Sequence, residues 1–162
     1  MTGAARPRPV VGALIRDPAG RIFVQRRSAD RSLFPGCWDV VGGAVEPGES
    51  LLDALRREIS EETGWRLRRV LARVAHTEWT ADGVRHLESD YLVEVDGDLS
   101  SPALEPDKHT EFAWLAAEDV TLLDENTLRS GSTFIKDVVT AAHAWRADPP
   151  GAAQPSEPSA DT

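Results

Sequence analysis

Three glutamates lie close together in the sequence and are the residues best suited to chemistry: Glu58, Glu61 and Glu62. On a helix that turns about 100° per residue, they occupy one narrow sector. Like charges at this spacing destabilise a helix unless a cation offsets them. Carboxylate oxygens bind hard divalent ions, and the chain offers no convincing His and Cys set for zinc. The pattern predicts a site for Mg²⁺ or Mn²⁺.

A solvated acidic face is the alternative interpretation, because glutamate is usually exposed. The helical wheel argues against it. The apolar arc of the wheel is formed by Leu51, Leu52, Leu55 and Ile59. Glu62 projects within this arc, Glu58 borders it, and Glu61 lies farther round on the side of Glu58. We therefore expect the carboxylates to face the protein body or a cleft at its edge.

A glycine-rich segment, residues 42–48, leads directly into the acidic helix. Most such segments are only turns. Placed before this helix, the backbone of Gly42 and Gly43 can approach a metal-bound diphosphate closely, because glycine has no side chain to hold it away. We take Gly42 as a candidate substrate contact.

The remaining pattern predicts the elements that position these residues. A helix is expected over residues 50–63, with Ser50 as its N-cap and Gly64 as its stop. Residues 10–16 and 22–25 read as a hairpin around an Asp-Pro-Ala-Gly turn. Further strands are predicted at residues 38–41, 68–77, 87–95 and 112–115, and a final helix at 132–145. Together they suggest a layered α/β sandwich with a mixed sheet.

Composition favours one folded domain. The chain has 162 residues, of which 41% are hydrophobic and 28% charged, as in ordinary globular proteins. We expect a loose N-terminus over residues 1–8, a folded body over 9–146, and a disordered C-terminal tail over 147–162. The tail is rich in Pro, Ala and Ser and has no bulky apolar residue to bury.

Charge and cysteine content narrow the partners. A net charge of −9 repels nucleic acid polymers and anionic lipid surfaces, while a small anionic substrate can bind where metal ions neutralise it. Cys37 is the single cysteine, which excludes an internal disulfide. The sequence contains neither a signal peptide nor an apolar run of membrane-spanning length. These features predict a cytoplasmic protein.

The acidic helix and the preceding loop together resemble the Nudix box, and the match is complete. The matching positions are Gly43, Glu49, Arg57, Glu58, Ile59, Glu61, Glu62, Gly64 and Trp65. A chance match in a chain of this length is on the order of one in ten million. The resemblance implies the Nudix α/β/α sandwich with a mixed central sheet. It also implies a Mg²⁺- or Mn²⁺-dependent hydrolase that cleaves a diphosphate linkage in a nucleoside diphosphate derivative.

The resemblance also implies roles for the residues of the box. Glu58 and Glu62 are then the primary metal ligands, and Glu61 is either a further ligand or the base that activates water. Gly43 offers its carbonyl to a metal. A bound divalent ion lowers the pKa of water and polarises phosphoryl oxygens, which agrees with attack of water at phosphorus.

Two further charged positions follow from the same resemblance. Arg57 and Glu49 are expected to form an ion pair that orients the loop and the helix. Glu111 precedes the strand at residues 112–115, where many relatives carry an additional catalytic acid. A surface glutamate at the entry of a strand is the competing interpretation of Glu111.

Candidate substrate contacts are spread over the chain. The segment that ends in Arg27 resembles the start of MutT-type nucleoside triphosphate pyrophosphatases, in which this arginine reaches a phosphate. Asn126, expected in the loop before the last helix, matches the position of an asparagine that reads the base. Phe23, Trp79 and Trp114 offer rings for base stacking, although most large aromatic residues belong to the core.

Three functions remain open. The leading hypothesis is a (d)NTP pyrophosphatase that releases a monophosphate and pyrophosphate. A nucleotide-sugar or other nucleoside-diphosphate pyrophosphatase would use the same site with a different pocket. A non-catalytic, ligand-sensing Nudix domain is the third, although the complete set of acids argues against it. We expect a small nucleotide-type substrate and neither a nucleic acid polymer nor a membrane as partner. Homodimers are common in the family, and no residue here decides that point.

Overall fold

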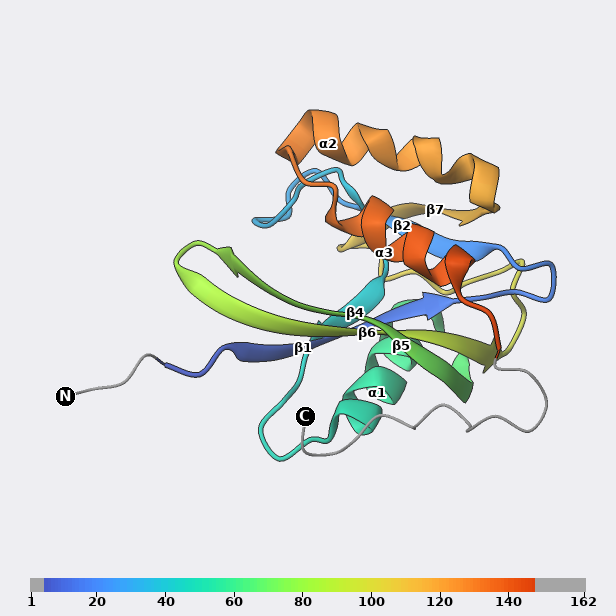
Figure 1. Ribbon diagram of the computed structural model, residues 1–162, viewed down its shortest axis with the longest axis horizontal. Helices are drawn as coiled ribbons and strands as arrows, with labels where there is room; N and C mark the ends of the chain where they lie inside the picture. Colours follow the sequence, from blue (N-terminus) through green and yellow to red (C-terminus); the bar gives the residue numbers. More distant parts are fainter. Residues whose placement is uncertain (1–4, 148–162) are drawn as a thin grey trace.

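The computed structural model describes residues 5–147, which form two β-sheets with helices on both sides (Figure 1). The larger sheet has the strand order β4 (Val41–Ala44), β1 (Arg8–Ile15), β6 (Val84–Asp96) and β5 (Arg66–Ala81). The smaller sheet has the order β3 (Trp38–Asp39), β2 (Ile22–Arg27) and β7 (His109–Leu115). Because β1 and β6 are parallel and their other neighbours antiparallel, the larger sheet is mixed, as predicted.

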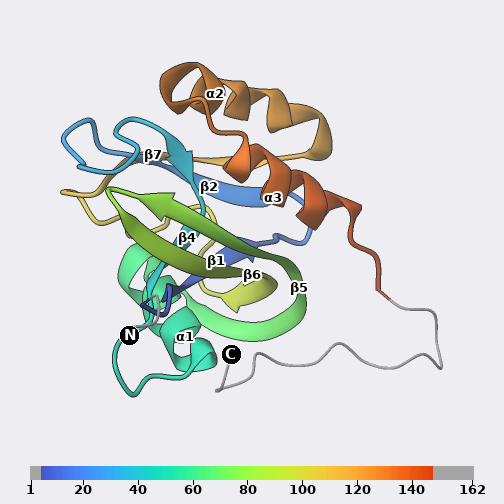
Figure 2. The ribbon, with the colours of Figure 1, turned by 60° about the vertical axis from the view of Figure 1, so that its left-hand side comes forward.

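The helices divide between the two sides of the molecule (Figures 1 and 2). They are α1 (Leu51–Thr63), the 3₁₀ helix η1 (Ala117–Leu123), α2 (Asp124–Ser130) and α3 (Phe134–Ala144). α1 packs on the face of the larger sheet that carries Val11 and Ala13. α3 packs with Leu14 of the opposite face and with the smaller sheet. The layered α/β prediction is confirmed.

The predicted hairpin between residues 10–16 and 22–25 is wrong. Only one bridge, Arg16 to Ile22, joins the two segments. β1 pairs with β4 and β6, whereas β2 pairs with β3 and β7. Both strands are largely buried. Each lies in a different sheet, and its apolar side chains pack between the layers of the molecule.

The predicted strand at residues 38–41 is divided between the two sheets. Trp38 and Asp39 pair with β2, and Val41 starts the strand β4 that pairs with β1. The chain therefore crosses between the sheets at Val40, just before the glycine-rich loop.

The secondary structure of the described residues begins with β1 at Arg8 and ends with helix α3 at Ala144. The predicted tail lies outside the described residues except for Ala147. No helix within residues 5–147 has the length and apolar character needed to cross a membrane.

Candidate active site

Helix α1 is built as the sequence predicts. The Ser50 side chain accepts a hydrogen bond from the backbone N–H of Asp53 at 3.0 Å, which satisfies one of the free donors of the first turn. Gly64 ends the helix in the left-handed conformation, with φ of 76°. The apolar arc faces the core, and Glu62 lies within it at 4% exposure. The prediction that this glutamate points inward is confirmed.

The buried carboxylate of Glu62 is held by two neighbouring elements. Its Oε2 accepts a hydrogen bond from the backbone N–H of Gly42 at 3.0 Å, and its Oε1 accepts one from Nε2 of Gln25 at 2.8 Å. Burial, followed by the nearby carboxylate of Glu58, raises its pKa well above the usual value. A cation at this position would relieve both effects.

Gly43 and Glu58 are in direct contact. A Cβ atom built on Gly43 would lie 2.5 Å from Oε1 of Glu58, closer than non-bonded atoms approach. A side chain at position 43 would therefore force the carboxylate of Glu58 to move from this position. This contact brings the backbone of the loop against the acidic face of α1, as the resemblance implied.

Arg57 connects the acids of this site. Its guanidinium group binds both carboxylate oxygens of Glu49, at 2.8 and 2.9 Å, and donates to the backbone carbonyl of Ala44 at 3.0 Å. Hydrogen bonds from Arg57 lower the pKa of Glu49 to about 2. Arg57 also donates to Glu58 at 2.8 Å and to Glu61 at 3.3 Å. It holds the loop and the helix together, as expected.

Glu61 differs from its neighbours in exposure. Its side chain is 52% exposed, against 13% for Glu58 and 6% for Glu62. The three carboxylates therefore run from the interior to the surface along one side of α1. Of the three carboxylates, that of Glu61 is therefore the most accessible to solvent.

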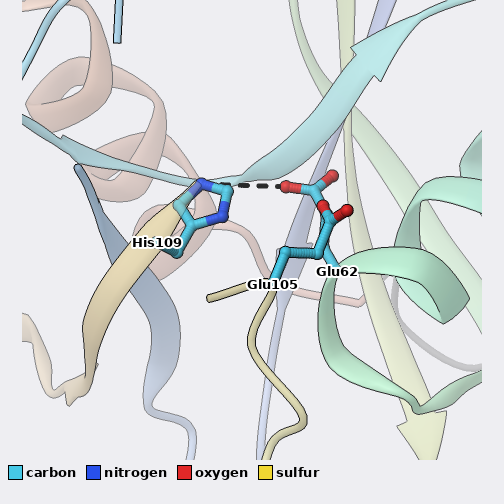
Figure 3. Close-up of side chains that lie close together, drawn as sticks. All are labelled: Glu62, Glu105 and His109. Carbon is cyan, nitrogen blue, oxygen red and sulfur yellow. Dashed lines mark ion pairs between the residues drawn. The ribbon is translucent and has the colours of Figure 1, made fainter. Parts of the chain in front are cut away.

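The structure adds two residues that sequence reasoning missed, Glu105 and His109, beside Glu62 (Figure 3). One ligand atom from each of the three lies within 4.8 Å of the others. Nε2 of His109 lies 3.9 Å from Oε1 of Glu62. Burial lowers the pKa of His109 to about 4, so its ring is neutral at pH 7 and this contact is not an ion pair. Neither ring nitrogen has a hydrogen-bond partner among the described residues.

The group formed by Glu62, Glu105 and His109 fits a divalent cation. It combines clustered carboxylate oxygens with a neutral imidazole, and hard divalent ions favour such oxygen-rich sites. Such an ion would offset the negative charges of Glu62 and Glu58. A ring nitrogen of His109, which has no hydrogen-bond partner among the described residues, could coordinate it. The part of the chain described here thus contains an acidic group able to hold a divalent metal.

Glu111 does not reach this group, which corrects its prediction as an additional catalytic acid. Its Oε1 pairs with Nε of Arg26 at 2.9 Å. Arg26 is the neighbour of Gln25 on β2, and adjacent strand residues point to opposite faces. Because Gln25 faces Glu62, Glu111 lies on the other side of the smaller sheet, where its side chain is 52% exposed.

Phe23 is not available to a substrate, so its prediction as a stacking surface is wrong. Its side chain is completely buried. The ring packs against Trp65 and Trp114, with centroids 5.0 and 5.2 Å away. β2 is buried on both faces over Ile22–Gln25, so its aromatic side chain belongs to the core.

A cavity of about 520 Å³ adjoins the glycine-rich loop on the sheet face away from α1, and several residues of the predicted site line it. They are Arg27, Gly42, Gly43, Trp79 and Asn126. Arg27 also pairs with Asp39 at 2.9 Å. Gly42 and Gly43 therefore border both the cavity and the carboxylates of α1.

Asn126 lies in helix α2 and not in the predicted loop. It is 4% exposed. Its Oδ1 accepts a hydrogen bond from the backbone N–H of Trp38 at 2.7 Å, and its Nδ2 donates to the carbonyl of Trp38 at 2.8 Å. The amide thus ties α2 to β3, and its first role is to shape the wall of the cavity.

Comparisons with known proteins agree with this geometry. The NUDIX domain model matches residues 6–137. The chain is 36% identical to nucleoside triphosphatase NudI of Escherichia coli K12 over 145 residues, which cover 83% of this chain and 99% of that protein. It is 33% identical to nucleoside triphosphatase NudI of Escherichia fergusonii over 147 residues, with the same coverage.

Solved structures give the same result. The crystal structure of a MutT NUDIX hydrolase from Burkholderia pseudomallei superposes with a TM-score of 0.63 at 29% identity, covering 78% of this chain and 99% of that one. The MutT protein from Methanosarcina mazei shares the fold, with a TM-score of 0.66 at 22% identity over 86% of this chain and 96% of that one. The family model, the relatives and the carboxylate geometry of α1 agree, and the chain belongs to the Nudix hydrolase family as a MutT-like member.

Proposed function

We propose that this protein hydrolyses (d)NTPs to a nucleoside monophosphate and pyrophosphate with the help of Mg²⁺. The observation that carries the proposal is the position of Gly42 and Gly43, which border both the acidic face of α1 and the adjoining cavity. A diphosphate at these glycines lies beside the carboxylates, with space next to it for a nucleoside. The relatives named nucleoside triphosphatase support this substrate class.

As the family resemblance implies, Glu58, Glu62 and Glu61 would hold the metal, with the backbone carbonyl of Gly43 as a further donor. Glu105 and His109, which lie beside Glu62, are additional candidates for the same ion. When bound, the ion supplies charge neutralisation of the diphosphate and an activated water. Mg²⁺ is proposed because carboxylate and carbonyl oxygens dominate the donor set.

The residues around these ligands hold them in place. Gln25 and the N–H of Gly42 fix the carboxylate of Glu62. Arg57 fixes Glu58 and, through Glu49, the start of α1. Such supporting contacts to metal ligands typically contribute about tenfold to a hundredfold to metal affinity or activity.

Arg27 and Gly42 are proposed as substrate contacts, Arg27 through a phosphate oxygen and Gly42 through its backbone. Arg31 lines the same cavity and adds a second positive charge. These arginines offset the carboxylates nearby and favour an anionic ligand despite the net charge of −9. A cytoplasmic location belongs to the same proposal, since Cys37 is a buried free thiol.

The test is a screen of the purified protein with Mg²⁺ against (d)NTPs, nucleotide sugars and dinucleotides, with products identified by mass. We expect a monophosphate and pyrophosphate from (d)NTPs, and loss of turnover in Glu62→Gln. Glu46→Gln is the matched control, because Glu46 is an exposed acid of the same loop. Turnover of nucleotide sugars alone would show that these, and not (d)NTPs, are the substrates. Tight nucleotide binding without turnover would indicate a sensing domain.

A further inference from the structure

Two buried carboxyl groups, Glu88 and Asp90, lie on β6 away from the acidic helix. Glu88 is 7% exposed and Asp90 is completely buried. Neither takes part in an ion pair among residues 5–147. Both oxygens of Asp90 lack a hydrogen-bond donor within the described residues. Glu88 accepts a hydrogen bond from a tryptophan ring, whereas the only group that interacts with the Asp90 carboxyl is that of Glu88. Burying two carboxyl groups with so few partners costs free energy, and a donor from a ligand would offset this cost.

The fold is shaped to hold this pair. Asp90 pairs with Gly12 on one side and Ala75 on the other, and both neighbours are small. A Cβ atom on Gly12 would lie 1.9 Å from Oδ1 of Asp90 and 3.2 Å from Oε2 of Glu88. The two carboxyl groups fit at this point of the sheet because residue 12 has no side chain.

Glu88 belongs to the cavity and not to the metal site. Gly12 and Glu88 line the cavity, whereas Asp90 is completely buried behind them, against Gly12. Val11, the neighbour of Gly12, packs with α1 on the opposite face of the sheet, because successive strand residues point to opposite faces. Glu88 and Asp90 therefore face away from Glu58 and Glu62.

Register sets the separation between the pair and the glycine loop. Gly42 pairs with Gly12, and Gly12 pairs with Asp90. Two strand spacings, about 10 Å in all, thus separate Gly42 from Asp90. One nucleotide can span this distance, with its diphosphate at Gly42 and its base near Glu88.

Aromatic side chains complete the surroundings of Glu88. Nε1 of Trp79 donates to Oε1 of Glu88 at 3.1 Å. The Trp79 ring stacks on His86 with centroids 4.0 Å apart, and Phe34 meets it edge-on at 6.2 Å. All three rings line the cavity. Flat rings beside hydrogen-bonding groups are the usual means of holding a nucleobase.

We propose that Glu88, backed by Asp90, selects nucleotides whose base carries an exocyclic amino group. A carboxylate oxygen of Glu88 accepts a hydrogen bond from such an amino group. A carbonyl in place of the amino group would set oxygen against this carboxylate and leave a buried polar group unpaired. The inference rests on the proposed nucleotide hydrolysis and adds its base specificity.

The test uses substrate pairs that differ at one position of the base, dCTP against dUTP and dATP against dITP. We expect kcat/KM to favour the amino-bearing member by about tenfold to a hundredfold, as for one charged hydrogen bond. In Glu88→Gln this preference falls toward unity, and Asp90→Asn, which alters the carboxyl behind Glu88, reduces it. Glu94→Gln is the matched control, because Glu94 lies on the same strand and pairs with Arg69 outside the cavity.

Binding distinguishes failure of this inference from failure of the proposed function. Calorimetry with dCMP and dUMP, and with dAMP and dIMP, reports base selection without turnover. Tighter binding of dCMP or dAMP that is lost in Glu88→Gln supports the inference even if no triphosphate is hydrolysed. Equal binding in both pairs, a preference for the oxo bases, or a preference unchanged in both variants overturns it.

Discussion

The carboxylate of Glu58 occupies the space that a side chain on Gly43 would fill, with 2.5 Å between its Oε1 and a Cβ built on the glycine. Glu58 can therefore keep this position only while residue 43 has no side chain. The contact thus places the Gly43 backbone, the proposed neighbour of the diphosphate, against the Glu58 carboxylate, a proposed metal ligand.

Replacing Gly43 with alanine should separate these two groups. We expect Gly43→Ala to lower kcat/KM and Mn²⁺ affinity by about tenfold or more, because Glu58 must move from its position. Mn²⁺ titration by calorimetry, together with circular dichroism, checks the effect in a folded protein. Ala44→Ser, an exposed change at the next position, is the control and should retain full affinity. Unchanged Mn²⁺ binding in Gly43→Ala would remove Glu58 from the proposed ligands.

Glu62→Gln separates the chemical role of the carboxylate from its structural role. Glutamine keeps the acceptor for the N–H of Gly42 and removes a charge that burial disfavours. We expect turnover to fall by more than about a hundredfold while the melting temperature stays equal or rises. Kinetics with Mg²⁺ and thermal unfolding of the metal-free protein measure the two effects. A lower melting temperature with retained turnover would contradict the assignment.

The Glu49–Arg57 pair predicts a loss of stability in acid. The pKa of Glu49 is about 2 in the folded protein against 4.5 without its partner. Its contribution is therefore complete above pH 4.5 and is lost as the pH falls through about 2. We expect Glu49→Gln to lower the free energy of unfolding at pH 7 by about 1 to 3 kcal/mol, with a smaller difference at pH 3.

Urea unfolding at both pH values measures this difference. Glu46→Gln is the matched control, because Glu46 is exposed and lies 3.8 Å from Arg57. A difference for Glu49→Gln that is equal at pH 7 and pH 3 would show that the pair is not its source.

Asp90 predicts the opposite dependence on pH. Burial, and then Glu88, raises the pKa of Asp90 well above its usual value of 3.8. A raised folded pKa means that the fold favours the protonated carboxyl, so stability falls as the pH rises above 3.8 toward the folded value. Asparagine carries no such penalty. We expect the stability of Asp90→Asn relative to the unchanged protein to increase between about pH 4 and pH 8, as followed by thermal unfolding.

Asn126 predicts a structural effect on the cavity wall. Asn126→Ala removes both hydrogen bonds to the backbone of Trp38 and leaves two buried groups unpaired. The expected loss of stability is about 2 to 4 kcal/mol. Asn126→Asp retains the acceptor for the Trp38 N–H but sets a buried carboxylate oxygen against the Trp38 carbonyl, so it should not restore the stability. If Asn126→Ala is as stable as the unchanged protein but binds nucleotide weakly, the residue acts on the base directly.

Sequence periodicity succeeded where one short segment carries its own geometry. The caps, the apolar arc and the inward position of Glu62 all follow from spacing along one helix. The Glu49–Arg57 pair is similarly local. These features depend on separations that a regular helix and a short loop set directly.

The sequence pattern did not predict which strands pair with each other. Residues 10–16 and 22–25 read as a hairpin, yet each strand pairs in a different sheet because burial on both faces outweighs proximity in sequence. The sequence also did not show that Phe23 is enclosed between two packed layers, or that Glu111 pairs with Arg26 on the sheet face away from Glu62.

The sequence by itself determined the family, the acidic helix and the glycine loop, because these lie within one continuous segment whose spacing specifies the geometry. Only the tertiary structure decided that His109 and Glu105 stand beside Glu62, and that Gly12 makes room for Asp90 beside Glu88. Those contacts join strands and loops far apart in the chain. Their positions follow from strand register and from which faces are buried, and neither is encoded in local residue spacing.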